Sequence, residues 1–174
     1  MSLPVHLAAG AVVVAVLVTM ALEAVLSAHN ERALRARGAV EADEDVIRWM
    51  RVGYPLGFVL IAIAGATNAT LDRERVLWGF VLFGAAKALK FWAISTLGPR
   101  WSFRVLVLHG EPLVSGGPYR YLRHPNYLAV LGEYAGVAAI LWAPVTGAVV
   151  AAAFGWLMWR RIRVEERALG IRRS

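Results

Sequence analysis

Long apolar stretches alternate with short polar segments along the chain. Leu3–Leu22 and Val52–Leu71 each hold 20 residues without a charge, and Val76–Leu97 is a third such stretch interrupted only by Lys87 and Lys90. About 20 residues of helix, rising 1.5 Å each, cross the ~30 Å hydrocarbon core of a bilayer. The pattern therefore predicts three membrane-spanning helices in this part of the chain.

The last apolar stretch predicts a helical hairpin. Leu128–Trp159 is 32 residues long with a single charge, Glu133, and as one helix it would measure about 48 Å, which is too long for one span. Pro144, after Ala143, interrupts a helix near its middle. We therefore expect an all-α integral membrane protein, one domain of residues 1–174, whose five transmembrane helices cover about residues 3–26, 52–71, 76–97, 126–143 and 145–162, the last two forming a tight hairpin.

Composition agrees with this pattern. Of 174 residues, 59% are hydrophobic and 18% are charged, and the mean hydropathy is +0.55. A soluble globule of this size could not cover its surface with so few charges, so an ordinary soluble enzyme is excluded. The chain has no cysteine, which excludes structural disulfides, iron–sulfur clusters and thiol catalysis.

The basic residues alternate between connections. Of 19 cationic residues 17 are arginines, and the formal net charge is +7. In so apolar a protein this charge is typical of cytoplasmic loops, and we expect no nucleic-acid partner. Arginines gather in the first connection, the third connection and the tail. Placing these segments inside predicts an N-terminus outside and a cytoplasmic C-terminus.

Charged residues within the apolar stretches have two interpretations. Lys87 and Lys90 share one helix face, and a charge at mid-depth costs roughly 2.5–3.5 kcal/mol. Glu133 or a water-filled cleft could offset that cost, or both lysines could extend toward the headgroups. We expect Glu23 to extend toward the headgroups as well. We read Ala28–Asp45 as a short surface helix that ends at Gly38, followed by a solvated acidic run of Glu41, Asp43, Glu44 and Asp45.

The densest polar segment is Leu113–Tyr127, with the sequence LVSGGPYRYLRHPNY. Its Gly-Gly-Pro predicts a turn, and Pro125 suits the first position of a helix. The backbone N–H groups of that helix start, with the side chains of Arg120, Arg123 and His124, would form an anion-binding pocket at the membrane face. The alternative is a basic interfacial loop with an aromatic belt of Tyr119, Tyr121 and Tyr127.

The second candidate is Arg160–Leu169, with the sequence RRIRVEERAL, at the end of the last span. Arg161 and Glu165 are one helical turn apart and share a face. They could be a surface pair worth a few tenths of a kcal/mol. However, the carboxylates of Glu165 and Glu166 fall on the same side of the membrane as the Arg/His loop, which favours a joint site.

Together the two segments resemble the isoprenylcysteine carboxyl methyltransferase family of membrane methyltransferases. The shared patterns are L-V-x-x-G-x-Y-x-x-x-R-H-P-x-Y and, later, R-I-x-x-E-E-x-x-L, and the resemblance covers about Leu89–Leu169. Upstream, Asn30–Glu41 and Phe91–Trp101 resemble a bacterial subgroup associated with type III polyketide synthases. That subgroup is implied to O-methylate alkylpyrones or alkylresorcinols.

The resemblance implies an S-adenosylmethionine site at the cytoplasmic face, built from a loop at 98–125 and the helix end at 160–169. Glu165 is implied to close the cofactor site and Arg161 to face the acceptor, while His124 and Glu165 are candidate bases; no metal is expected. Many relatives have His where this chain has Glu111. The implied cofactor-binding residues are Arg104, Glu111, Pro112, Leu113, Val114, Gly117, Tyr119, Arg123, His124, Pro125, Asn126, Tyr127, Glu165 and Glu166.

The resulting hypothesis is methyl transfer to an oxygen of a lipophilic small molecule that enters from the bilayer of a bacterial inner or plasma membrane. The acceptor is expected to resemble an alkylpyrone or alkylresorcinol, or else a prenylcysteine-type carboxylate. Methyl transfer is an in-line displacement that depends chiefly on alignment. Phospholipid or amine N-methylation, NADPH-dependent sterol-type reduction, and a structural membrane subunit remain as alternatives.

Overall fold

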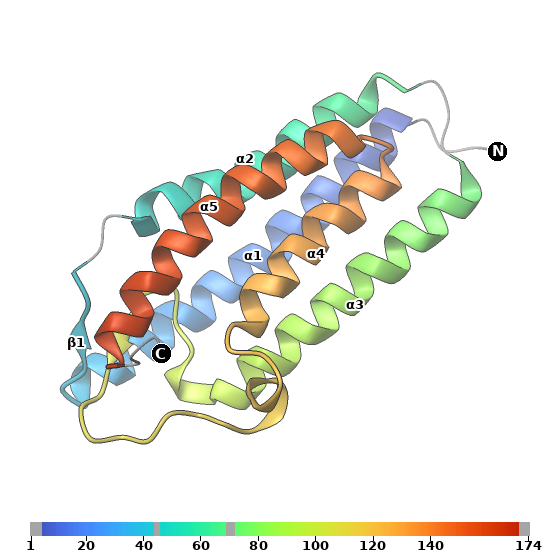
Figure 1. The fold of residues 1–174 in the computed structure, drawn as a ribbon. Coiled ribbons are helices and arrows are strands. Elements are labelled where there is room, and N and C mark those ends of the chain that lie inside the picture. The colour runs from blue at the N-terminus through green and yellow to red at the C-terminus, as the bar shows by residue number, and fades with distance from the viewer. Residues whose placement is uncertain (1–4, 44–45, 69–71, 171–174) are drawn as a thin grey trace.

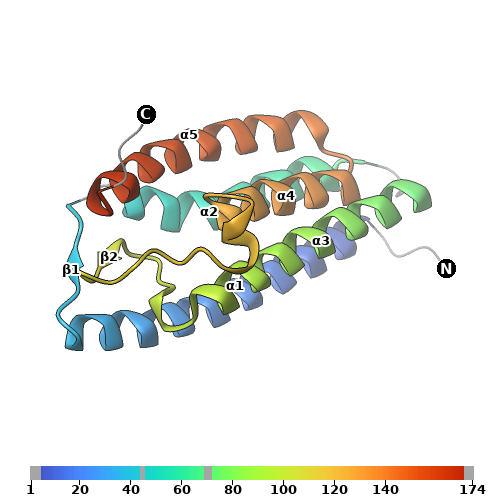
Figure 2. The ribbon, with the colours of Figure 1, turned by 60° about the horizontal axis from the view of Figure 1, so that its bottom comes forward.

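The computed structural model describes residues 5–43, 46–68 and 72–170, and five α-helices make up most of it. They run side by side as an elongated bundle (Figure 1). Helix α3 packs on α4, and α2 packs on both α1 and α5. Turned by 60°, the bundle shows α5 on the side opposite α1 and α3 (Figure 2). The helices are α1 (Val5–Ala36), α2 (Val46–Ala66), α3 (Arg73–Leu97), α4 (Pro125–Ile140) and α5 (Pro144–Ala168).

Three of these helices are long and apolar enough to cross a membrane: α1 from Ala9, α2, and α3 continued to Arg100. Their outward faces carry large apolar side chains such as those of Leu22, Ile63 and Phe91. The predicted span ends at residues 3–4 and 69–71 lie outside the described residues. Helix α4 has only 16 residues, about 24 Å at 1.5 Å per residue. The structure is therefore mostly helical, as predicted, and three of its helices are candidate membrane spans.

The predicted hairpin between α4 and α5 is present. Both helices begin with a proline at their first position, where the missing N–H costs no helical hydrogen bond. At the corner Trp142 adopts φ = 51°, and its ring lies 3.9 Å from the Arg75 guanidinium carbon. Asn68 at the end of α2 donates hydrogen bonds to the Leu141 and Trp142 carbonyls. This corner, which we call the hairpin end, ties α2, α3, α4 and α5 together.

The expectation of a separate surface helix over Ala28–Asp45 is wrong, because α1 continues without a break to Ala36. It ends, as expected, at Gly38 with φ = 85°, and Ala39 N–H bonds back to the Leu34 carbonyl at 3.0 Å. Residues 26–30, with the sequence LSAHN, contain neither glycine nor proline, so nothing in that segment stops the helix. The polar residues after Leu26 therefore extend the same helix that carries the apolar stretch.

The predicted solvated acidic run is also wrong for Glu41. Val40–Glu41 forms a short strand, β1, that pairs antiparallel with β2 (Leu106–Val107). The Glu41 carboxylate binds Arg35 and Arg104. Partial burial raises the pKa of this carboxyl, but its hydrogen bonds and charge attraction to the two arginines outweigh that effect and lower the pKa overall. Glu44 and Asp45 lie outside the described residues.

The helices approach each other closely at glycines. A Cβ atom on Gly136 of α4 would lie 2.7 Å from the Phe83 backbone nitrogen of α3, and one on Gly65 of α2 would lie 2.5 Å from the Leu141 Cβ. Small residues at helix crossings are typical of membrane bundles, where close packing replaces the hydrophobic driving force. Beyond these crossings, toward the end away from the hairpin, the helices enclose an open space.

Candidate functional site

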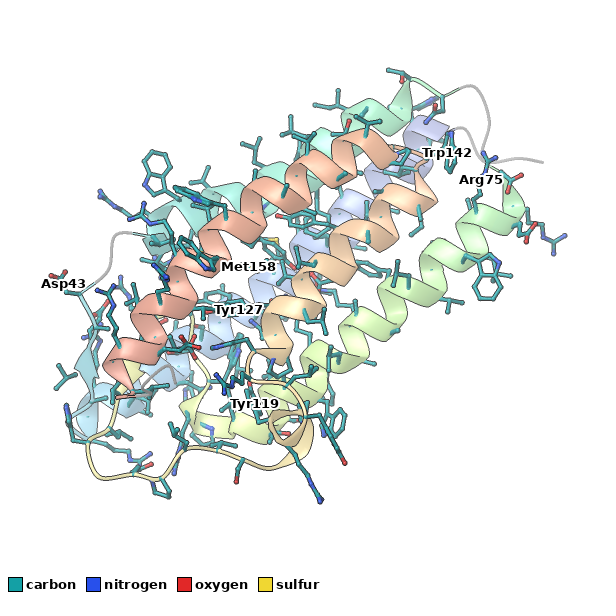
Figure 3. All side chains as sticks on the ribbon, viewed as in Figure 1. Asp43, Arg75, Tyr119, Tyr127, Trp142 and Met158 are labelled. Atoms are coloured by element: carbon teal, nitrogen blue, oxygen red, sulfur yellow. The ribbon has the colours of Figure 1, made fainter. Side chains whose placement is uncertain are left out.

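A cavity of about 740 Å³ occupies the end of the bundle opposite the hairpin end. We call this the open end. Its walls come from α1, α2, the end of α3, the 98–125 segment, the start of α4 and the last turns of α5. Figure 3 shows Tyr119 and Tyr127 at this end, far from Trp142 and Arg75 at the hairpin. Its lining includes every predicted site residue but one: Arg104, Glu111, Pro112, Leu113, Val114, Tyr119, Arg123, His124, Pro125, Asn126, Tyr127, Arg161, Glu165 and Glu166.

Gly117 is the predicted site residue outside this lining. It adopts φ = 54° at the start of the short 3-10 turn Gly117–Arg120. A Cβ atom there would lie 2.3 Å from the Thr96 Oγ1 on α3. Gly117 therefore allows the turn to pack against α3, which brings Tyr119 to the cavity wall.

Arg161 and Glu165 are joined through Tyr127. Arg161 is only 5% exposed, and its Nε donates to the Tyr127 hydroxyl at 3.1 Å while its Nη2 donates to the Phe103 carbonyl. The Tyr127 hydroxyl in turn donates to Glu165 Oε2 at 3.1 Å. A burial this deep does not fit the alternative of a solvated surface pair. Three segments that are far apart in the sequence are thereby connected: the 98–125 loop, α4 and α5.

His124 lies between the two predicted carboxylates. Its Nδ1 is 3.9 Å from Glu165 Oε2, and its Nε2 is 3.6 Å from Glu166 Oε1. His124 occupies the N-cap position of α4 but its side chain makes no capping hydrogen bond. Its imidazole is instead placed against α5 and near the Tyr127 ring, with centroids 5.5 Å apart. The two sequence motifs therefore form one polar wall.

Asn126 adds an acceptor to this wall. Its Oδ1 is buried and has no hydrogen-bond partner among the described residues, although the residue lines the cavity. A buried acceptor without a donor costs about 1–3 kcal/mol. The atom is therefore suited to receive a hydrogen bond from a ligand.

Ion pairs hold the 98–125 loop over the cavity. Arg104 binds Glu41 and lies 3.5 Å from Glu31, while Glu111 binds Arg37 and lies 2.7 Å from Arg100. Burial and, secondarily, the Glu165 charge raise the pKa of the Tyr119 hydroxyl far above its usual range. Tyr119 is therefore a neutral donor in this wall across the physiological pH range.

The inner end of the cavity meets a cluster of buried charges. Lys90, 4% exposed, lies 2.8 Å from Glu23 and 3.4 Å from Glu133, and Lys87 lies 3.1 Å from Glu133. The predicted role of Glu133 as the lysines' partner is confirmed. The alternative that the lysines extend to the headgroups is wrong, as is that expectation for Glu23, because the opposite charges satisfy each other inside the bundle.

Sequence reasoning missed the contribution of α1. Glu23, Ser27 and Glu31 line the cavity at successive four-residue steps along one face. Ser27 donates to Glu31 and accepts the Phe103 N–H, both at 2.7 Å. The four-residue spacing of polar side chains at the end of an apolar helix was the available signal. That spacing is meaningful only because α1 continues past Ala28, where the sequence had predicted a separate helix.

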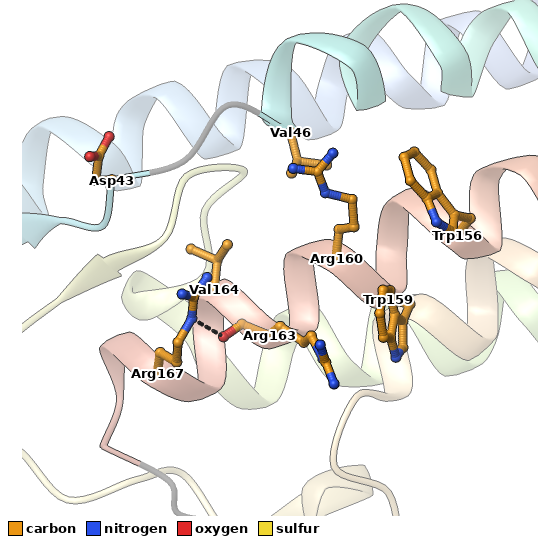
Figure 4. A pocket seen from close by; sticks show the side chains of 8 residues that line it. All are labelled: Asp43, Val46, Trp156, Trp159, Arg160, Arg163, Val164 and Arg167. Atoms are coloured by element: carbon orange, nitrogen blue, oxygen red, sulfur yellow. Dashed lines mark hydrogen bonds between the residues drawn. The ribbon is translucent and has the colours of Figure 1, made fainter.

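A second, shallower hollow of about 550 Å³ lies on the outside of the bundle between the start of α2 and the end of α5 (Figure 4). Its arginines lie along tryptophan rings: the Arg163 guanidinium carbon is 4.3 Å from the Trp159 ring centre, and that of Arg160 is 5.4 Å from the Trp156 centre. Amphipathic side chains of this kind are typical of a membrane–water boundary. The predicted site residues do not line this hollow.

Comparison with known proteins gives one family and two relatives. Residues 77–171, more than half of the chain, match the model of the isoprenylcysteine carboxyl methyltransferase family. The uncharacterized protein YpbQ of Bacillus subtilis (strain 168) is 27% identical over 156 residues, covering 88% of this chain and 91% of its own length. An uncharacterized protein of Haemophilus influenzae is 25% identical over 146 residues, covering 83% and 84%. No solved structure matches the chain. The matched range contains all predicted site residues, whereas Glu23 and Tyr54 precede it.

Proposed function

The chain belongs to the isoprenylcysteine carboxyl methyltransferase family of membrane methyltransferases, and on this premise we propose that it transfers a methyl group from S-adenosylmethionine to an oxygen of a lipophilic small molecule. The observation that carries the proposal is the cavity that joins the two predicted motifs at His124, Tyr127, Arg161 and Glu165. Acceptors of the alkylpyrone or alkylresorcinol class fit best, since the subgroup resemblance favours them over prenylcysteine-type carboxylates.

The donor set fits the proposed cofactor. S-adenosylmethionine offers an ammonium and a ribose diol as donors, and the unbonded Oδ1 of Asn126 and the carboxylates of Glu165 and Glu166 are acceptors on one wall. Charge-assisted hydrogen bonds of this kind are about twice as strong as neutral ones. The N-terminus of α4, with its backbone N–H groups and the positive end of the helix dipole, favours binding of the cofactor carboxylate. When bound, the cofactor supplies an electrophilic methyl group on a sulfonium.

The chain's own residues align and enclose the reactants. The Tyr119 and Tyr127 rings suit a neighbouring cation, which a tyrosine face attracts by about 0.5–2 kcal/mol. The buried arginine of α5 is held by the Phe103 carbonyl and Tyr127, so its position is fixed before an acceptor arrives. Fixed alignment is the main requirement of an in-line displacement. We propose that the ion-paired 98–125 loop limits the access of water to this site.

We further propose that all five helices traverse the membrane, with the open end in the cytoplasm, the N-terminus outside, and entry of the acceptor from the bilayer. The charge distribution supports this orientation, because the hairpin end carries only Arg73 and Arg75 among the described cations. By the positive-inside rule, the more basic end faces the cytoplasm. The described basic residues near the open end are Arg32, Arg35, Arg37, Arg48, Arg51, Arg100, Arg104, Arg120, Arg123, Arg160, Arg161, Arg163 and Arg167.

Ligand-dependent stabilisation tests the cofactor assignment. S-adenosylhomocysteine should raise the unfolding temperature of the purified protein in detergent, because a ligand that binds only the native state stabilises it. NADPH is the matched control for the reductase alternative. A shift with NADPH and none with S-adenosylhomocysteine up to millimolar concentration would reject the methyltransferase proposal.

Methyl-transfer assays test the acceptor class. The protein should methylate a long-chain hydroxypyrone or alkylresorcinol faster than a farnesylcysteine analogue at equal mole fraction in mixed micelles. Preference for the farnesylcysteine analogue would assign the acceptor to the prenylcysteine class and leave the cofactor assignment intact.

A further inference from the structure

The buried and partly buried charges at the inner end of the cavity form an organised group contributed by four helices. Glu23 comes from α1, Tyr54 from α2, Lys87 and Lys90 from α3, and Glu133 from α4. In addition to its two ion pairs, the Lys90 ammonium donates to the Tyr54 hydroxyl at 3.1 Å, and that hydroxyl donates to Glu133. Two acids and two bases give the group no net charge when all four are ionised.

Only part of this group is accessible from the cavity. Glu23, Tyr54 and Lys90 belong to the cavity lining, whereas Lys87 and Glu133 do not. Glu133 is completely buried, at 0% exposure, and lies behind the other three. The three lining residues can therefore contact a ligand in the cavity, whereas Lys87 and Glu133 can only support them.

Bundle stability alone does not account for such a group. Buried ion pairs can often be replaced by apolar residues with no loss of stability, and ionisable residues within membrane helices usually serve binding or transport. Around the three lining residues the wall is apolar and includes Met20, Met50, Val130 and Phe154. A polar patch on an otherwise apolar inner wall is suited to an amphiphilic ligand with one polar end.

We propose that Glu23, Tyr54 and Lys90 bind the acidic ring of the acceptor, a hydroxylated ring or cyclic enol with an alkyl chain; this rests on the proposed methyltransferase function. The acceptor binds as its conjugated oxyanion beside the Lys90 ammonium, and the Tyr54 hydroxyl turns its one proton from Glu133 to the oxyanion. Glu23 binds one proton at the same time. The acceptor's O–H bond breaks, an O–H bond forms on the Glu23 carboxyl, and the electron pair stays on the ring oxygens.

Charge balance explains why Glu23 takes the proton. A net charge in the low-dielectric interior is costly, and an added oxyanion would give the neutral group a charge of −1. Protonation of Glu23 restores neutrality and releases Lys90 from its closest ion pair, so that the ammonium can pair with the ring oxygen. Lys87 and Glu133 remain paired behind it and hold the position of Lys90.

The group lies deeper in the bundle than the wall at Tyr127. Glu133 is six residues beyond Tyr127 on α4, which places its backbone about 9 Å farther along the helix, and the long side chains of Lys90 and Arg161 extend into the cavity between these levels. In this proposal the oxygen held at Lys90 and the oxygen that faces Arg161 and Tyr127 are different oxygens of the same ring. The apolar wall at Met20 and Met50 takes the first part of the alkyl chain.

Binding measurements with three probes test this assignment. We would measure the affinity of the full chain in detergent for a long-chain hydroxypyrone, a long-chain resorcinol and an alkylbenzene of the same chain length. Lys90→Met and Tyr54→Phe should weaken the two hydroxylated probes about tenfold or more and leave the alkylbenzene nearly unchanged. Equal losses for all three probes, or no loss for the hydroxylated pair, would overturn the proposal.

Lys87→Met is the matched control. It removes a lysine from the same group, but this lysine does not line the cavity, so it acts on the bound oxyanion only through the charge of the group. The variant should therefore weaken the hydroxylated probes less than Lys90→Met does. If Lys90→Met does not fold, Tyr54→Phe, which removes one oxygen atom, decides the same question. A selective loss with Lys87→Met as large as that with Lys90→Met would also overturn the proposal.

Proton uptake separates binding of the ring from a merely structural charge cluster. Calorimetry at one pH, in buffers of different ionisation enthalpy, should show uptake of about one proton when an already ionised hydroxypyrone binds the wild-type protein. Glu23→Gln should abolish that uptake. Uptake that is absent in the wild type, or unchanged in Glu23→Gln, would contradict the role of Glu23.

These results remain distinguishable from the proposed function itself. Affinity for S-adenosylhomocysteine should be unchanged in Lys90→Met and Tyr54→Phe, because neither residue belongs to the wall at His124 and Glu165. If S-adenosylhomocysteine binds but the hydroxylated probes show no dependence on these residues, the ring site is wrong and the methyltransferase proposal stands. If S-adenosylhomocysteine does not bind the wild-type protein, the proposed function fails regardless of the ring probes.

Discussion

The two ends of the bundle differ in how closely their helices pack. At the hairpin end the helices meet at Gly65, Gly79, Gly136 and Gly147, each so close to a neighbour that a Cβ atom would lie within 3 Å of it. At the open end the same helices separate around a cavity lined by charged and aromatic residues. The close contacts at the hairpin end fix the spacing of the helices, and this spacing leaves room for the cavity at the open end. The candidate site therefore lies at one end of the bundle.

Substitutions in the charge group between the two ends should have the largest effect on the stability of the protein. Glu133→Leu leaves Lys87 and Lys90 with Glu23 as the remaining carboxylate of the group, and removing one partner of a buried pair costs roughly 3–5 kcal/mol. We expect a correspondingly lower unfolding temperature in detergent.

The double variant Glu133→Leu/Lys87→Met is the control for this effect. It removes one charge of each sign and restores neutrality, so it should recover more than half of the lost stability, a coupling that a double-mutant cycle measures. Additive losses from the two substitutions would show that the charges act independently.

Substitutions at the closely packed glycines of the hairpin end should have the next largest effect on stability. Gly136→Val places carbon atoms against the Phe83 backbone, and overpacking of this kind costs about 1–3 kcal/mol. Gly84→Ala is the control on α3, because a Cβ atom at Gly84 would have no neighbouring atom within 4 Å. This substitution should be neutral or stabilising by up to about 1 kcal/mol. Equal thermal shifts for both variants would contradict the tight crossing of α3 and α4.

At the open end, Glu165→Ala and Arg161→Ala should fail in different ways. Glu165→Ala removes a proposed charge-assisted hydrogen bond, so affinity for S-adenosylhomocysteine should fall about tenfold, or 1.4 kcal/mol. Arg161→Ala should bind the cofactor nearly normally and lose turnover, because its proposed role is to place the acceptor.

Cofactor affinity and single-turnover methylation of both variants test that division. Near-wild-type values in both assays would mean that this end of α5 has no role in the reaction. An equal loss of cofactor affinity in the two variants would instead show that Arg161 and Glu165 act as one unit. Their connection through the Tyr127 hydroxyl provides a physical route for such coupling.

The smallest effect concerns acid stability at the edge of the open end. Because Arg35 and Arg104 hold the pKa of Glu41 below its unfolded value of about 4.5, the carboxylate stabilises the fold above pH 4.5, and that contribution is lost as the pH falls through the lower folded pKa. Glu41→Gln should therefore flatten the decline of the unfolding temperature below pH 4.5. An unchanged decline would mean that the β1–β2 pair does not depend on this charge.

The sequence predicted the helices and the grouping of His124 with Glu165 better than it predicted the position of Glu23. Apolar length and two prolines identify α4 and α5, and the spacing of the two motifs places His124 and Glu165 together. The continuity of α1 and the burial of Glu23 were missed because both depend on partners far along the chain. Glu23 pairs with Lys90, and Ser27 accepts from the Phe103 N–H. The local sequence of α1 carries no information about either partner.

The cavity reaches from an ion-paired polar loop at Arg104 to an apolar inner wall at Met20 and Met50. A water-soluble cofactor and a membrane-dissolved acceptor would therefore reach it from different phases. The acceptor concentration that matters is then its mole fraction in the lipid, not its amount per volume of solution. Diluting the acceptor with inert lipid at constant total acceptor should slow the reaction, whereas diluting the whole vesicle suspension should hardly change the degree of saturation by acceptor. In kinetic terms, the bilayer would be the second solvent of the proposed reaction.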